Sequence, residues 1–215
     1  MFLSAYRFSE KYVHQYNLES EESENSFLQK YHHTHEVVKW MKLFVENESF
    51  TDEEKQLAYA VALFHDIGRF VQLKKYYRNN DFFTNFDHAK ESIRILQENH
   101  GFTSHVNKEE EDIISFAIFY HNKFEVPKKE GFAYDVAHLL RDADKLANLE
   151  TLAYTDFSGC ILSEEVYKQF LKKTLIKECD VKNDVDELVA KLAWIFDIHY
   201  SKSLLFIKEF HLLDR

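Results

Sequence analysis

The chain has 215 residues, 45% of them apolar, and a formal net charge of −10 at pH 7, which is typical of one folded acidic domain. It contains 4 Gly and 1 Pro, where average usage would give roughly 26, so the turn-rich sequence of a β protein is excluded. The glycines are too widely separated for a dinucleotide-binding fingerprint or a P-loop. The acidic balance disfavours binding to duplex nucleic acid but leaves a small phosphorylated substrate open.

No segment predicts a membrane span or a signal peptide. The longest apolar run, 57–64, falls well short of the roughly 20 residues that cross a bilayer. Arg7 and Glu10 interrupt the N-terminal segment too early for a signal peptide. Cys160 and Cys179 form no CxxC pair and are interpreted as reduced thiols. We therefore expect a cytoplasmic protein that does not bind membranes.

The first half of the chain predicts helices separated by one irregular stretch. Helical spacing favours a helix over 27–48. Thr51 and Glu54 carry the signature of a capping box, so a second helix begins there, and it is expected to end near Gly68. The stretch 70–86 is expected to be irregular.

The second half continues in the same way. Phe86 or Asp87 begins a helix that Gly101 closes, and Asn107 precedes the acidic first turn of another. Apolar residues keep helical spacing over 133–155. Two further helices are expected, over 164–174 and 185–210. Because no segment alternates with period 2, the prediction is an all-α fold, formed as a single domain over 1–215.

Several histidines and aspartates lie on successive predicted helices. His65 and Asp66 are adjacent, and side chains about 100° apart on a helix can reach one metal ion if other helices supply further ligands. Helical bundles build imidazole and carboxylate metal sites in this way. The candidate ligands in chain order are His33, His65, Asp66, His88, His121 and Asp144.

Three segments resemble a known family: YHHTHEVV (31–38), LFHDIGR (63–69) and LRDADKL (140–146). They are similar to the HD superfamily of metal-dependent phosphohydrolases, whose ordered signature is a His, a His-Asp dyad and a late Asp. The likeness covers about residues 28–155. It implies an HD-like helical bundle there, with a C-terminal helical extension over about 163–215 that completes the core or makes a homodimer contact.

The resemblance implies which residues bind the metal. The first ligand falls on His33, four residues before Val37, rather than on His32 or His35. The dyad falls on His65 and Asp66.

The last ligand falls on Asp144, because Ala-Asp-Lys-Leu matches there and not at Asp142. Asp142 is expected to be exposed, or paired with His138 or Lys145 at helical spacing.

Members of the superfamily with two metals imply further ligands, at His88 and His121. Asp66 would then bridge two ions about 3.5 to 4 Å apart. With a single ion, these two histidines would instead orient water or phosphate, so one or two ions per chain stay open. Imidazole and carboxylate ligands favour Mn, Fe, Co, Ni or Zn, and Mg is also allowed.

The activity implied is hydrolysis of a nucleotide, another small phosphomonoester or a phosphodiester by a metal-bound hydroxide. Asp66, Arg69 and Lys145 are the predicted catalytic residues, Arg69 and Lys145 as groups that grip the phosphate. The alternative for the nearby basic residues Lys74, Lys75 and Arg78 is a solvated loop.

Two other classes of protein stay open. Some HD-fold proteins are di-iron oxygenases with the same ligand pattern, and bound iron with oxygen uptake would identify that class. A non-catalytic binding or regulatory module with a structural metal would bind a ligand without turnover.

Overall fold

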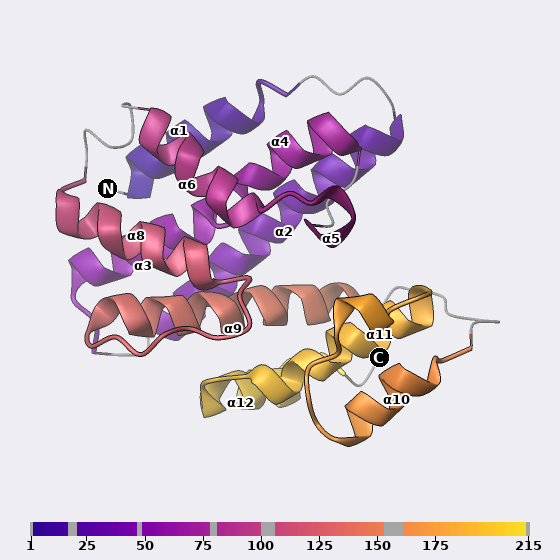
Figure 1. Ribbon diagram of the computed structural model, residues 1–215. Helices are drawn as coiled ribbons and strands as arrows, with labels where there is room; N and C mark the ends of the chain where they lie inside the picture. Colours follow the sequence, from indigo (N-terminus) through magenta and orange to yellow (C-terminus); the bar gives the residue numbers. More distant parts are fainter. Residues whose placement is uncertain are drawn as a thin grey trace. The chain divides into compact units, whose positions relative to one another are not determined.

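The computed structural model describes residues 2–16, 21–46, 49–77, 81–99, 106–152 and 161–213. Helices are the only regular structure in these ranges, which confirms the all-α prediction (Figure 1). The chain divides into two compact units, Met1–Arg141 and Asp142–Arg215, and the single domain over 1–215 stays a prediction. No helix in the ranges above combines the length and the apolar character needed to cross a bilayer.

The first unit is organised around one buried helix, α3 (Asp52–Phe64). Helix α3 packs against α1, α2 and α8, while α4 packs against α6. Every residue from Leu57 to Phe64 is buried, as expected of a helix that is apolar on all sides. The helices around it are α1 (Phe2–Val13), α2 (Glu21–Val45), α4 (Ile67–Tyr76), α5 (Asp81–Thr84), α6 (His88–Glu98), α8 (Lys108–Tyr120) and the beginning of α9 (Phe132–Leu152).

Helices α3 and α8 begin with capping boxes. Thr51 Oγ1 accepts from the Glu54 amide at 3.2 Å, and Glu54 accepts from the Thr51 amide at 2.8 Å. Asn107 and Glu110 make the same pair of bonds at the start of α8. Each box satisfies two backbone amides that the helix leaves without a partner, so the position of the first turn is fixed by sequence. The two predicted helix starts are confirmed.

Several predicted boundaries are wrong. Gly68 does not end a helix but lies inside α4, which begins at Ile67 and continues to Tyr76. The stretch 70–86 is therefore largely helical, because residues 69–75 are mostly good helix formers and contain no Gly or Pro. Helix α1 was not predicted. Three expected helix ends, Glu48, Gly101 and Thr155, lie outside the described residues. Arg78 and Cys160 lie outside them as well.

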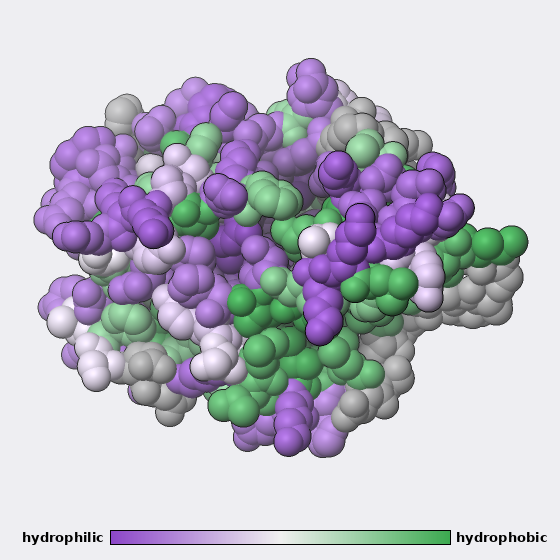
Figure 2. Space-filling view, turned by 60° about the horizontal axis from the view of Figure 1, so that its bottom comes forward, coloured by the Kyte–Doolittle hydropathy of each residue, from purple (hydrophilic) through white to green (hydrophobic). Residues whose placement is uncertain are grey.

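The second unit does not contain the long helix expected over 185–210. That range divides into α11 (Asp184–Leu192), η2 (Ala193–Asp197) and α12 (Ser201–Glu209), preceded by α10 (Glu164–Leu171) and η1 (Glu178–Asp180). Large apolar side chains are exposed on this unit, including Leu205 and Leu171, and Figure 2 shows one face where apolar groups gather among hydrophilic ones. The predicted homodimer contact stays a prediction.

Asp142 explains the break before α12, and its expected exposure is wrong. Its side chain is fully buried. It accepts from the backbone amides of His199 at 3.0 Å and Tyr200 at 2.9 Å, and from Ser203 Oγ at 2.6 Å. The carboxylate thus satisfies donors at the beginning of α12, where the positive end of the helix dipole favours an anion.

Asp142→Ala should destabilise the second unit by about 3 kcal/mol, because it leaves the buried Ser203 hydroxyl and two partly buried backbone amides without their charged acceptor. Urea unfolding would measure the loss, and hydrogen exchange would locate it in α12. The exposed Asp184 in the same unit offers a matched control, and Asp184→Ala should change stability far less. Equal losses from the two substitutions would contradict the anchoring role of Asp142.

Candidate metal centre

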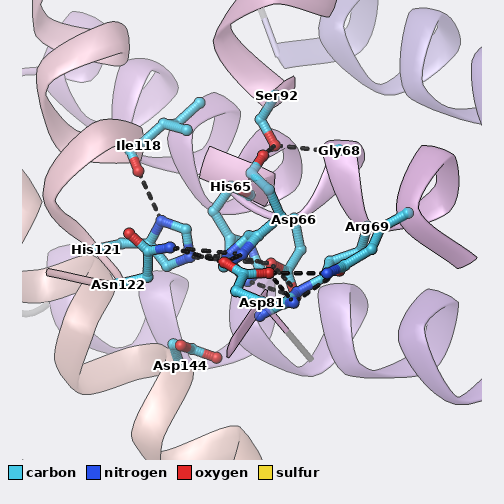
Figure 3. A network of polar contacts seen from close by, with 12 residues as sticks. His65, Asp66, Gly68, Arg69, Asp81, Ser92, Ile118, His121, Asn122 and Asp144 are labelled. Carbon is cyan, nitrogen blue, oxygen red and sulfur yellow. Dashed lines mark hydrogen bonds and ion pairs between the residues drawn. The ribbon is translucent and has the colours of Figure 1, made fainter. Parts of the chain in front are cut away.

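The His65-Asp66 dyad occupies the turn between two helices. His65 is the C-cap of α3, and Asp66 is the N-cap of α4. Both side chains are buried, and His65 Nε2 lies 3.6 Å from Asp66 Oδ2 (Figure 3). In a continuous helix, two adjacent side chains would point about 100° apart. The break between α3 and α4 instead brings the two side chains to one centre.

Helix α6 packs directly against the turn that carries His65 and Asp66. Ser92 Oγ accepts from the Gly68 amide at 2.9 Å and lies 3.0 Å from the His65 carbonyl oxygen and 2.9 Å from the His88 carbonyl oxygen (Figure 3). Gly68 allows the two backbones to approach, because a Cβ atom there would overlap the His88 carbonyl oxygen. The contact places His88, the first residue of α6, beside the dyad.

His65 and His121 are oriented by their own helices. His65 Nδ1 lies 2.7 Å from the Ala62 carbonyl oxygen, and His121 Nδ1 lies 2.6 Å from the Ile118 carbonyl oxygen. Because a carbonyl oxygen only accepts, each Nδ1 must carry the proton. Each Nε2 then presents a lone pair, which is the form of imidazole that binds a metal ion.

Asp66 lies between two sets of imidazoles. Its Oδ1 atom is 3.2 Å from His88 Nε2 and 3.9 Å from His121 Nε2. Its Oδ2 atom faces His65 Nε2 and also lies 3.2 Å from Lys30 Nζ. The ligand atoms of Asp66, His88 and His121 all lie within 4.8 Å of one another, so this group could hold one ion.

The chemistry of this first group fits a metal cation. His88 Nε2 and His121 Nε2 are 3.0 Å apart. With its proton on Nδ1, His121 presents the lone pair of Nε2 toward His88 in a buried site, and a cation between the two nitrogens could accept it. Burial and the nearby Arg69 lower the pKa of His88, which favours the neutral ligand form. Two imidazoles and a carboxylate suit a divalent transition metal.

A second predicted group consists of His33, His65 and Asp144. The rings of His33 and His65 lie in the first unit with their centroids 5.8 Å apart, whereas Asp144 is on α9 in the second unit. His33 is buried on α2, whereas His32 is exposed and His35 is half-buried near Glu10. All of the predicted ligands except Asp144 thus lie close together in the first unit, and the binding of a metal by the six stays a prediction.

Two cations neutralise the buried carboxylate of Asp66. Burial alone would raise the pKa of Asp66, but the positive charges of Lys30 and Arg69 hold it well below its usual range. Lys30 was not predicted as a site residue, and nothing in its local sequence distinguishes it from a solvated lysine. It reaches Asp66 only because α2 packs against α4.

Arg69 is engaged within the site. Its Nη1 atom lies 2.6 Å from Asp81 Oδ1 and 2.8 Å from Gln72 Oε1, and its Nε atom is 3.5 Å from Asp66 Oδ1. Arg69 therefore links the carboxylates of Asp66 and Asp81. Its binding of a substrate phosphate stays a prediction.

Lys145 is the other residue predicted to bind the phosphate of the substrate. Its Nζ atom donates to the backbone oxygen of Asp197 and lies 2.6 Å from the Asp197 carboxylate, both within the second unit. Its predicted catalytic role stays a prediction. Lys74 and Lys75 are exposed, as expected of a solvated face.

Arg141 is a second residue that sequence reasoning did not assign. Its buried guanidinium donates to the backbone oxygens of Tyr120 and His121 at 3.1 and 3.3 Å, and also to that of Lys123. The carbonyls of Tyr120 and His121 lie at the end of α8, where a helix leaves its last carbonyls without helical donors, and Lys123 follows shortly after. Arg141 therefore fixes the segment that carries His121.

The site thus gathers histidines and an aspartate from successive helices of an all-α fold, a set of side chains that could hold a divalent metal ion. A family model described as the HD domain matches residues 31–149, more than half of the chain. The chain belongs to the HD domain family, whose members are mostly metal-dependent phosphohydrolases. Comparisons with curated proteins and with solved structures found no match.

Proposed function

We propose that the protein is a phosphohydrolase that depends on divalent transition-metal ions and acts on a nucleotide, another small phosphomonoester or a phosphodiester. The observation that carries the proposal is the position of Asp66, whose two oxygens face different imidazole groups. A carboxylate in this position can bridge two ions. His33, His65 and Asp144 would hold one ion, and His88 and His121 the other.

Divalent ions bound here would lower the pKa of a coordinated water toward neutrality and offset charge on phosphoryl oxygens. The protein's own residues do the rest. The carbonyls of Ala62 and Ile118 hold two imidazoles in the ligand tautomer. Lys30 and Arg69 supply positive charge beside Asp66, so a phosphate group approaching the centre would meet cations as well as carboxylates.

We expect the purified protein to contain one or two equivalents of a divalent transition metal and to release phosphate from at least one of the three substrate classes. Elemental analysis measures the metal. A screen of nucleotides, small phosphomonoesters and phosphodiesters, supplemented in turn with Mn, Fe, Co, Ni, Zn and Mg, measures the activity.

The histidines of α2 provide a matched control. His33→Ala should lower both the metal content and the rate, whereas His32→Ala removes an exposed neighbour and should change neither. Absence of metal after reconstitution would contradict the proposal. Turnover in none of the three classes, with bound iron and oxygen consumption, would favour the oxygenase chemistry instead.

A further inference from the structure

Asp81 is the first residue of the short helix α5, within the stretch that the sequence predicted as irregular. Its Oδ2 atom lies 2.5 Å from His88 Nδ1 and 3.4 Å from Asn122 Nδ2. Its Oδ1 atom accepts from Arg69 Nη1 at 2.6 Å and from Gln72 Nε2 at 3.0 Å. Both oxygens of one carboxylate are thus directed at donors around the site (Figure 3).

His88 needs an acceptor from outside its own helix. His65 and His121 follow the last residues of α3 and α8, so each Nδ1 can donate to a helix carbonyl three residues earlier. His88 is the first residue of α6, and no turn of that helix precedes it. Asp81 supplies the missing acceptor, since an ionised carboxylate accepts but does not donate.

The Asp81 carboxylate is itself held in place. Arg69 and Gln72 lie on α4, and Gln72 Nε2 also donates to Thr84 Oγ1 at 2.8 Å. Gln72 is fully buried. These bonds tie both ends of α5 to α4, so the carboxylate cannot turn away from His88 without losing a charged partner.

We infer that Asp81 is a positioning residue that holds His88 with the proton on Nδ1, so that Nε2 is directed at Asp66 and His121 for metal binding. The inference rests on the proposed function for its metal-binding part. Partners of this kind fix the orientation of a ligand imidazole, and their loss typically weakens metal binding by 10- to 100-fold.

The tautomer of His88 is the direct test. In metal-free protein labelled with ¹⁵N-histidine, long-range proton–nitrogen NMR spectra should show the His88 proton on Nδ1, as for His65 and His121. His88→Gln assigns the signal. A His88 proton on Nε2 in the wild-type protein would overturn the inference, whatever happens to any variant.

Asp81→Asn tests the cause. The amide has one acceptor oxygen, and Arg69 should attract it because a hydrogen bond to a charged donor is the stronger one. The NH2 group then faces His88 Nδ1, which must accept, so the proton should move to Nε2 and block the metal-binding atom. We expect the ion that His88 would hold to bind roughly 10- to 100-fold less tightly in this variant.

Asp87→Asn is the matched control. Asp87 caps α6 beside His88, but its carboxylate accepts from Lys90 N and Lys123 Nζ, and asparagine is an equally good N-cap. This variant should keep both the wild-type tautomer and the wild-type metal affinity, measured by competition with a chelator.

The two proposals fail in different ways. If the wild type binds metal and hydrolyses phosphate esters but Asp81→Asn binds both ions with unchanged affinity, the role of Asp81 is refuted and the proposed function stands. If the wild type binds no metal at all, the proposed function fails, and the metal-free NMR spectra still decide whether Asp81 orients His88.

Discussion

Asp66→Ala should remove metal from both groups and lower the rate of phosphate release by at least about 1,000-fold. The substitution deletes the one carboxylate whose oxygens face both sets of imidazoles. A metal ion contributes several kcal/mol to stabilisation of a phosphoryl transition state, and about 4 kcal/mol corresponds to a factor of 1,000. Elemental analysis and the rate with the best substrate would measure the two losses together.

Asp66→Asn separates charge from shape. The amide fills the same space and can still offer one oxygen, so we expect it to keep part of the metal but little of the activity. In both variants Lys30 loses its charged partner, and far-ultraviolet circular dichroism would verify that the helices are intact. Phosphate release at the wild-type rate by metal-free Asp66→Ala would refute the mechanism.

Gly68→Ala should destabilise the first unit by about 3 kcal/mol or more and weaken metal binding by Asp66, His88 and His121. An added Cβ would overlap the His88 carbonyl oxygen and lie 2.8 Å from the Ser92 amide nitrogen. Both are backbone atoms of α6, so the helix must move as a whole. Overpacking usually costs 1–3 kcal/mol, and a collision with backbone belongs at the upper end or beyond.

Gly131→Ala distinguishes this collision from a general effect of replacing glycine. Gly131 has φ +84°, and nothing lies within 4 Å of an added Cβ. Its substitution should cost about 1–2 kcal/mol through backbone strain alone and leave the metal content unchanged. Chemical unfolding and elemental analysis of both variants provide the comparison. If Gly68→Ala kept wild-type metal binding, the close approach of α6 would not be needed to place His88.

The candidate ligands could be proposed from sequence because the family signature is local and ordered, and their binding of a metal stays a prediction. The motifs lie on predicted helices, and they indicate which histidine of each segment is the candidate ligand: His33, His65, His88 and His121. The capping boxes at Thr51 and Asn107 were predictable for the same reason, since each involves residues only three apart.

The supporting residues could not be predicted, because their roles depend on contacts between distant segments. Lys30 reaches Asp66 across 36 positions, and Arg141 reaches His121 across 20. Asp142 is expected from sequence to be exposed, or paired within its own helix, yet its side chain is buried and accepts hydrogen bonds from residues 57 to 61 positions later. No periodicity within one helix contains that information.

The distance along the chain from cap to ligand restricts how this fold can change in length. Helices α3 and α8 each have 13 residues, and in each the residue directly after the last turn is a histidine predicted as a ligand. The caps fix where the helices begin, so an inserted or deleted residue inside either helix would rotate the imidazole by about 100° and shift it by about 1.5 Å. Segments before Thr51 and Asn107 carry no such restriction. Length variation among related chains should therefore accumulate ahead of the caps and be absent between each cap and its histidine.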